Sequence, residues 1–293
     1  MAQQSSKQRA EEAVLDLNSK LRQLNKALAG KGAVVAENAP LVATIKAVEA
    51  MKAQASVAIT IFKSQQFFGY VDVELPPMSI AEVYKQANLS YCFANNKALK
   101  SLPNVENLDV AVNMSSYAIG CSSLIDVSLG ALTNATDISS AFSGCTSLAS
   151  VTIGAAPKAT IAQQIFAGCN NLKDVSIDLS GGLLKNLTYA FLSCTNLHRV
   201  TGVIDLSSAE SVAGVFQGCQ SLEEVRIKGL KVDLDLSPCV NLSVESVRYL
   251  IENAQAVSGK RIDLSRALLD AHEEELGDLG DTASDKGWAI NYK

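Results

Sequence analysis

The sequence predicts an α/β solenoid, in which short repeated units stack and pair their strands in parallel. The first observation is a recurring Phe-x-Gly-Cys-x-x-Leu-x-x-Val-x-Ile pattern with a period of 24 or 25 residues, clearest in the copies that begin at Phe142, Phe166, Phe191 and Phe216. A fixed period of this length is typical of architectures whose units are too small to bury an apolar face alone. The second observation is the alternation of apolar residues after the leucine, which is typical of a strand with one buried face.

Weaker copies extend the repeat in both directions, so we expect six to seven units over residues 85–242. The copy at Phe93 has Asn96 in place of the cysteine, and the copy at Ala118 lacks the phenylalanine. A degenerate last copy contains Cys239. Within each unit we predict a short helical turn before the phenylalanine, a corner at the Gly-Cys step and a strand at Leu-x-x-Val-x-Ile.

The cysteines are interpreted as structural. Six of the seven occupy one register of the repeat, and stacking places equivalent residues about 4.8 Å apart with parallel side chains. Disulfides need closer, converging Cβ atoms, and a straight column does not supply a tetrahedral zinc site. We therefore predict reduced, buried thiols that pack as small hydrophobic side chains. The seven are Cys92, Cys121, Cys145, Cys169, Cys194, Cys219 and Cys239.

Residues 1–54 are expected to form an N-terminal helical region that anchors or oligomerises the chain. A helix is predicted over residues 6–29, because apolar residues recur there at heptad spacing. Its candidate oligomer seam contains Val14, Leu17, Leu21, Leu24 and Leu28. Two interpretations remain open: a short oligomerising coiled coil, or an amphipathic helix that packs on its own chain. A second helix is predicted over residues 38–52, and residues 55–84 are interpreted as a β-hairpin cap and linker.

Residues 243–293 are expected to form a C-terminal α/β cap over the last repeat. Ser243 can cap a helix that runs to about residue 255, and residues 261–264 are predicted to form a strand. A second helix is predicted over residues 266–276, before a final strand that begins at Trp288. Trp288 is interpreted as a core residue of the cap, with a ligand-stacking platform as the alternative.

The sequence contains no pattern of an enzyme or cofactor site, so we expect no catalytic residue, no bound metal and no cofactor. The two histidines, His198 and His272, are far apart, and no phosphate loop, metal-binding His pair or Gly-x-Ser-x-Gly elbow is found. A net charge of −5 without a basic cluster argues against nucleic acid as a partner. No stretch is long and apolar enough to suggest insertion into a membrane.

The outward side chains of the predicted strands form the candidate partner-binding face. They are small and hydroxylated toward the first repeats and charged toward the last, and the candidate contacts are Asp174, Arg199, Glu224 and Arg226. A ligand site and a solvated ladder both remain open, because neither column of outward residues contains an aromatic side chain. The first column is Ser101, Asp126, Ser150, Asp174, Arg199 and Glu224, and the second is Ser128, Thr152, Ser176, Thr201 and Arg226.

The repeated pattern resembles the BspA-like class of leucine-rich repeats over roughly residues 85–245. This resemblance implies a right-handed solenoid with parallel strands, used for binding and adhesion. The closing segments Leu242-Ser-Val-Glu-Ser-Val, Lys260-Arg-Ile-Asp-Leu and Lys286-Gly-Trp-Ala-Ile resemble the ends of repeat proteins encoded by tailed phages and prophages of gut bacteria. The opening, with Leu24-Asn-Lys-Ala-Leu, is similar in type to phage tail and fibre proteins.

These resemblances imply a structural virion protein, a head or tail fibre or appendage that presents the solenoid for assembly or for attachment to a host surface. The expected partners are other virion proteins, further copies of the chain in a homo-oligomer such as a trimer, and a glycan or protein of the host surface. The first residues lack the apolar region of a secretory signal, so assembly in the bacterial host cytoplasm and a place in the virion are expected. The alternative is a bacterial cell-surface adhesin or interaction module of the same repeat class, which needs an export route.

Overall fold

The computed structural model describes residues 19–26, 87–102 and 108–293 of the chain. The first stretch belongs to one compact unit, Met1–Phe62, and the other two belong to a second unit, Lys63–Lys293. Residues 19–26 are helical, within the helix predicted over residues 6–29. The predictions for residues 38–52 and 55–84 lie outside the described residues, as do three seam residues: Val14, Leu17 and Leu28.

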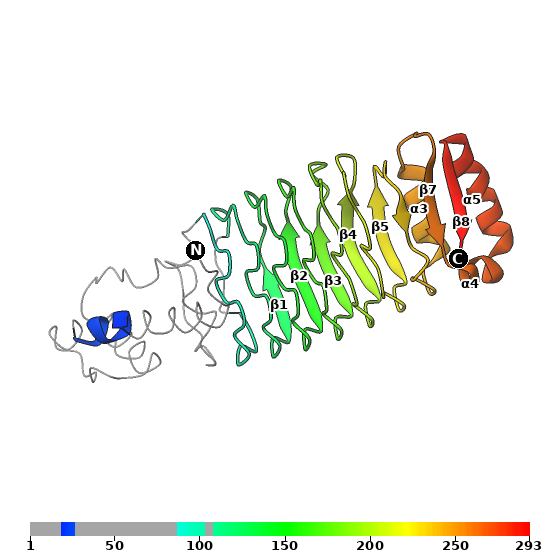
Figure 1. Ribbon diagram of the computed structural model, residues 1–293. Coiled ribbons are helices and arrows are strands. Elements are labelled where there is room, and N and C mark those ends of the chain that lie inside the picture. Colours follow the sequence, from blue (N-terminus) through cyan, green and yellow to red (C-terminus); the bar gives the residue numbers. More distant parts are fainter. Residues whose placement is uncertain (1–18, 27–86, 103–107) are drawn as a thin grey trace, which may run out of the picture. The chain divides into compact units, whose positions relative to one another are not determined.

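Five strands of the second unit form one parallel sheet with the order β1-β2-β3-β4-β5, which confirms the predicted solenoid (Figure 1). Equivalent valines of consecutive repeats pair directly, so the register of the sheet is the register of the sequence repeat. Each strand turns its apolar residues inward, as Val175 and Ile177 of β3 do. The strands are β1 (Asp126–Leu129), β2 (Ser150–Ala155), β3 (Asp174–Asp178), β4 (Arg199–Asp205) and β5 (Glu224–Lys228).

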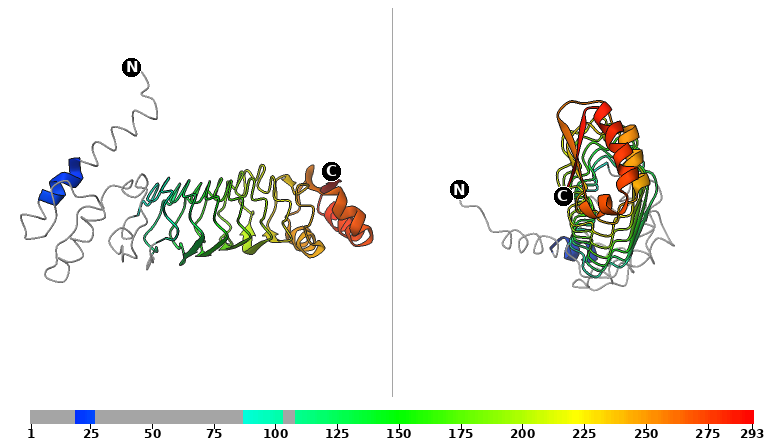
Figure 2. Two further views of the ribbon diagram at one scale, coloured as in Figure 1. Left: turned by 90° about the horizontal axis from the view of Figure 1, so that it is seen from below. Right: turned by 90° about the vertical axis from the view of Figure 1, so that its right-hand side faces the viewer.

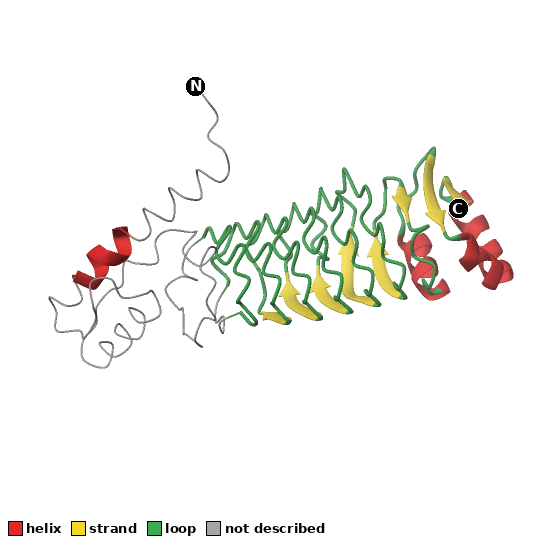
Figure 3. Ribbon diagram, turned by 60° about the horizontal axis from the view of Figure 1, so that its bottom comes forward, coloured by secondary structure: helices red, strands yellow, loops and turns green. Residues whose placement is uncertain are grey.

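The segment before each phenylalanine, predicted as a short helical turn, is a run of turns that joins neighbouring repeats. Phe142 N–H donates to Ile165 O of the next repeat at 2.9 Å, while intervening N–H groups donate within their own repeat. The chain adopts left-handed conformations on both sides of the phenylalanine, at Ser140 (φ 53°) and at Gly144 (φ 74°). The stack is therefore hydrogen-bonded on the turn side as well as on the strand side. Seen end-on, its coils nearly superpose (Figure 2, right). Figure 3 shows the strands along one side of the stack and the loops and turns along the rest.

A column of aromatic rings fills the core beneath the turns. The four rings from Phe142 to Phe216 stack at centroid distances of 5.8, 5.5 and 5.3 Å. In the Ala118 copy, which lacks the phenylalanine, the fully buried Tyr117 supplies the ring and packs edge-on against Phe142 at 6.2 Å. The aromatic column is therefore continuous through the copy that looks defective in the sequence.

All seven cysteines are free, and their predicted burial is confirmed. Five of the thiols also donate a hydrogen bond to a main-chain carbonyl of the preceding repeat. Cys169 Sγ lies 3.1 Å from Phe142 O, and Cys194 Sγ lies 3.1 Å from Phe166 O. Burial raises the pKa of the Cys194 thiol to about 12, so this donor stays protonated at neutral pH.

Helix α3 (Val244–Asn253) lies where the next strand of the repeat would be, and it ends the sheet. Ser243 is the N-cap, as predicted, and its side chain accepts a hydrogen bond from Ser246 N–H at 3.2 Å. Ser243 N–H itself donates to Glu223 O at 2.8 Å, so the last repeat pairs with its predecessor up to the first residue of the cap. The buried face of α3 includes the predicted residues Val247, Leu250 and Ile251.

The rest of the cap is a second parallel sheet with two further helices. Its strand order is β6-β7-β8, with β6 (Leu234–Asp235), β7 (Lys260–Leu264) and β8 (Trp288–Tyr292). The single helix predicted over residues 266–276 is wrong, because His272 separates α4 (Arg266–Ala271) from α5 (Glu273–Asp285). α5 continues through two glycines because burial of Leu276, Leu279 and Ala283 outweighs the low helix propensity of glycine.

Lys286 fastens the end of α5 to the end of α3. Its ammonium group donates to three main-chain carbonyls that close α3, and a positive charge at this position complements the helix dipole. The three acceptors are the oxygens of Ile251 at 3.0 Å, Glu252 at 2.6 Å and Ala254 at 3.4 Å.

The next two residues complete this junction. Gly287 has φ 80°, and a Cβ atom there would overlap the Val257 carbonyl oxygen, so the close approach requires glycine. Trp288 is buried, and its Nε1 donates to Gln255 O at 2.8 Å. The prediction that Trp288 is a core residue of the cap is confirmed.

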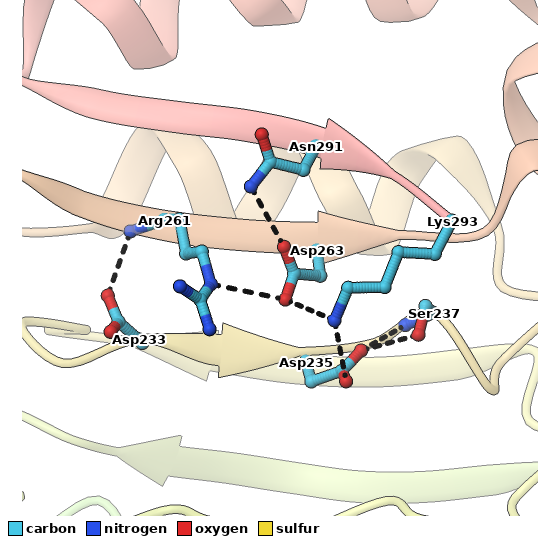
Figure 4. A network of polar contacts seen from close by, with 7 residues as sticks. All are labelled: Asp233, Asp235, Ser237, Arg261, Asp263, Asn291 and Lys293. Atoms are coloured by element: carbon cyan, nitrogen blue, oxygen red, sulfur yellow. Dashed lines mark hydrogen bonds and ion pairs between the residues drawn. The ribbon is translucent and has the colours of Figure 1, made fainter.

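A charged network ties the strands of the second sheet together around Asp263 (Figure 4). The Asp263 side chain is buried and accepts hydrogen bonds from Lys293 Nζ at 2.6 Å and Asn291 Nδ2 at 3.1 Å, with Arg261 Nε at 3.4 Å. Lys293 also reaches Asp235 Oδ2 at 3.1 Å. Burial by itself raises the pKa of the Asp263 carboxyl, but the hydrogen bonds from Lys293 and Asn291 outweigh it and hold this pKa below its ordinary value.

Candidate partner-binding face

The first outward column lies on the strand face as one continuous row. Its members pair from repeat to repeat in the predicted order, from Ser101 to Glu224. Arg199 Nε donates to Asp174 Oδ1 at 2.8 Å, and this hydrogen bond raises the pKa of the guanidinium. Because both side chains are well exposed to solvent, the pair orients Arg199 more than it stabilises the fold.

The second outward column is interrupted between β4 and β5, contrary to the prediction. Its first four members pair in succession, but the register of the sheet shifts between Val200 and Ile204. The segment 201–203 therefore lies opposite the single residue Arg226, which makes a bulge in β4. Gly202 allows the bulge, because it has φ 94° and any Cβ atom there would overlap the Ile177 carbonyl oxygen.

A groove of about 540 Å³ lies where the β4 bulge, β5 and α3 meet. α3 flanks the free edge of β5, since Val225 N–H donates to Ser246 Oγ at 3.2 Å. The groove exists because the chain departs from the repeat at two adjacent places, the bulge and the helix. We call it the β4–β5–α3 groove, and its lining includes Val200, Val203, Glu224, Arg226, Glu245 and Tyr249.

Arg226 and Tyr249 form the distinctive pair of this groove. The guanidinium of Arg226 lies over the Tyr249 ring, 5.8 Å from its centroid. Within residues 87–102 and 108–293, Arg226 is the one arginine whose side chain has no acidic partner among the described residues. The other four arginines there each pair with an acidic side chain: Arg199, Arg248, Arg261 and Arg266.

Tyr249 is a residue that sequence reasoning missed, because it lies in neither outward column. Its spacing from the buried residues of α3 indicates a position off the core face. Its contact with Arg226 depends on α3 taking the place of a strand, and no local sequence signal gives that position.

Of the candidate oligomer seam, Leu21 and Leu24 lie in the described residues, on the helical stretch 19–26. Both side chains are half-buried, and the neighbouring Asn25 is buried. The seam stays a prediction, since its other members lie outside the described residues.

Three further properties hold within residues 19–26, 87–102 and 108–293. No three or more histidine, cysteine or acidic side chains gather there in a way that could hold a metal ion. No helix in these ranges has the length and apolar character needed to cross a membrane. Every buried side-chain nitrogen or oxygen in the same ranges has a hydrogen-bond partner.

Comparison with protein families identifies the repeated part of the chain. Residues 113–235 match the family model of the BspA type leucine rich repeat region in six copies. Comparison with curated proteins and with solved structures gives no match. Repeats of this type are typically interaction modules rather than enzymes, and they generally mediate contacts between proteins. Residues 113–235 thus match the BspA type leucine-rich-repeat region, and they fold as a solenoid with a parallel sheet.

Proposed function

We propose that this chain is a non-enzymatic binding protein whose solenoid presents the strand face, from Asp174 to Arg226, to a partner. The observation that carries the proposal is the β4–β5–α3 groove, where an exposed arginine lies over a tyrosine ring in a lining that also contains two carboxylates. Arginine and tyrosine are enriched among the residues that dominate binding energy at interfaces. The earlier part of the face, from Ser101 to Ser150, is polar and regular and serves as a solvated ladder.

We assign the chain to the virion of a tailed phage, as a head or tail fibre or appendage assembled in the cytoplasm of the bacterial host. The resemblance of the closing segments to phage-encoded repeat proteins supports this assignment. So does the resemblance of the opening segment around Leu24 to tail and fibre proteins. In this role residues 1–54 attach the chain to other virion proteins and to its own copies, and the strand face meets a host glycan or protein.

Fractionation of phage particles tests the assignment to a virion. Particles purified on a density gradient should contain the chain at a fixed ratio to the major capsid protein, as measured by mass spectrometry. If the chain stays in the cytoplasmic fraction of the host and is absent from particles, the assignment to a virion is wrong.

The second candidate is a bacterial cell-surface adhesin or interaction module, which the BspA type repeat itself favours. Labelling of intact cells with a reagent that does not cross membranes distinguishes the two candidates. A labelled chain on producing cells that release no particles supports the adhesin.

Charge reversal tests the strand face in either role. The triple variant Arg199→Glu, Glu224→Lys and Arg226→Glu should reduce attachment to host cells by about tenfold or more, since charged contacts across interfaces are sensitive to reversal. The matched control is Lys185→Glu, an exposed residue outside the outward columns that pairs with Glu210 at 3.2 Å. Equal attachment by the triple variant and the control, with unchanged circular dichroism, would refute the role of the strand face in binding.

The oligomer seam has its own test. The double variant Leu21→Glu and Leu24→Glu should lower the mass measured by light scattering from that of an oligomer, a trimer if the chain serves a fibre, to that of the monomer. An unchanged mass would show that the helix packs on its own chain instead.

A further inference from the structure

We propose that the β4–β5–α3 groove binds a single carboxylate, the aspartate or glutamate side chain of a partner protein, and that Arg226 is its anchor. This inference rests on the proposed function of the strand face and names the chemistry of the partner. It concerns the groove alone, so it can fail while the binding face stands.

Arg226 is held ready for an anionic ligand. Its guanidinium is a planar fork that matches a carboxylate through two parallel hydrogen bonds. Its contact with the Tyr249 ring limits the orientations of the guanidinium, which reduces the entropy lost on binding, and Arg226 stays exposed to solvent. Arg199 differs, because Asp174 already occupies its fork at 2.8 Å.

The apolar part of the groove strengthens such a contact. Val200 and Val203 lie in the lining beside Arg226. Val203 is half-buried, whereas the side chain of Val200 belongs to the core. A carboxylate beside Val203 and Arg226 is partly removed from bulk water, and an ion pair becomes stronger as the local dielectric constant falls. The volume of about 540 Å³ suits one side chain with its adjoining main chain rather than a flat patch of surface.

The acidic residues of the groove define which anions are accepted. Glu224 and Glu245 lie in the same lining as Arg226. They repel a densely charged polyanion, such as a nucleic acid or a polyanionic glycan, more strongly than one carboxylate flanked by neutral or basic groups. This pattern favours an acidic side chain of a folded protein over a polyanionic polymer.

The test is a titration of the full chain, labelled at its valine methyl groups, followed by NMR. The probes are acetyl-Leu-Glu-Leu-amide and its isostere acetyl-Leu-Gln-Leu-amide, each added to about 10 mM because a single contact gives millimolar affinity. The acidic peptide should shift the methyl signals of Val203, the half-buried valine of the lining, and the glutamine peptide should bind at least about tenfold more weakly.

Variants assign the effect to the anchor. Arg226→Gln should abolish the shifts, and Arg226→Lys, which keeps the charge but loses the fork, should weaken binding. Arg266→Gln is the matched control, an exposed arginine outside both the strand face and the groove, and should bind as the parent chain does. Because Arg226 is exposed, the circular dichroism of its variants should be unchanged.

Three results would overturn the inference: no shift with the acidic peptide, equal shifts with both peptides, or shifts retained in Arg226→Gln. Glucuronic acid, titrated in the same way, must bind no better than the peptide, because tighter binding would make the ligand a carboxylated sugar. If the peptide fails to bind but the charge-reversal variant still loses attachment to host cells, this inference is wrong and the proposed binding face is retained.

Discussion

Two glycine-to-alanine substitutions in the cap should change stability in opposite directions. Gly287 has φ 80°, and a Cβ atom there overlaps the Val257 carbonyl oxygen. The left-handed conformation and the overlap together predict a loss of about 2–5 kcal/mol for Gly287→Ala. Gly277 lies in α5, and a Cβ atom at this position would have no neighbouring atom within 4 Å. Gly277→Ala should therefore add about 0.5–1 kcal/mol, the difference in helix propensity.

Tryptophan fluorescence measures both changes, because Trp288 is the single tryptophan of the chain and is buried in the same cap. With an m-value of about 2 kcal/mol per molar urea, Gly287→Ala should lower the midpoint of unfolding by about 1 M or more. Gly277→Ala should raise it by about 0.25–0.5 M. An unchanged or raised midpoint for Gly287→Ala refutes the close approach to Val257. If both variants lose the same stability, the space around the added Cβ atom does not determine the effect of the substitution.

Four further outcomes are expected. Phe166→Ala should cost about 3–5 kcal/mol of stability in thermal unfolding, because it removes one ring from a stacked column. Lys286→Met should lower the midpoint seen by tryptophan fluorescence by the equivalent of about 1–2 kcal/mol, since it removes the donor to the end of α3. The seven thiols should react with Ellman's reagent only after unfolding, because burial raises their pKa values. The pKa of Asp263 is lowered in the fold, so the ionised side chain stabilises the fold fully above the ordinary carboxyl pKa, and this stabilisation is lost as the pH falls below it. Asp263→Asn should therefore lower the free energy of unfolding at pH 7. In urea titrations the difference from the parent chain should shrink below about pH 4.

The solenoid follows from the sequence because its period and its alternation are local signals. Each repeat places Leu-x-x-Val-x-Ile at one position, and the paired valines and their neighbours keep this register from β1 to β3 as far as Ile153, after which the pairing of β2 shifts. The turn segments do not follow in the same way, because left-handed residues such as Ser140 and Gln164 are not glycines. Their conformation depends on hydrogen bonds from the neighbouring repeat. Tyr117 could not be assigned to the core from the repeat pattern either, because its ring enters the aromatic column from the residue before the phenylalanine position, which Ala118 occupies.

The candidate face is predictable only in part for a related reason. The row from Ser101 to Glu224 follows from strand alternation, and the structure places it as expected. The bulge has a visible signal, the extra residues between Val200 and Ile204, but their effect on Arg226 depends on pairing between strands. The contact between Arg226 and Tyr249 requires the position of α3, which is set by packing against β5.

The contacts that hold the solenoid join each repeat only to its immediate neighbours. Main-chain hydrogen bonds, thiol donors and stacked rings all act over one step of the repeat, and each step adds about 4.8 Å to the stack. The groove is built by β4 and β5, the last two strands of the first sheet, and by α3. Duplication of a whole unit near Phe142 would thus move the groove farther from the first described repeat and leave every residue of its lining in place. The length of the solenoid and the residues that line its groove are therefore separate properties of this chain, and each can evolve without altering the other.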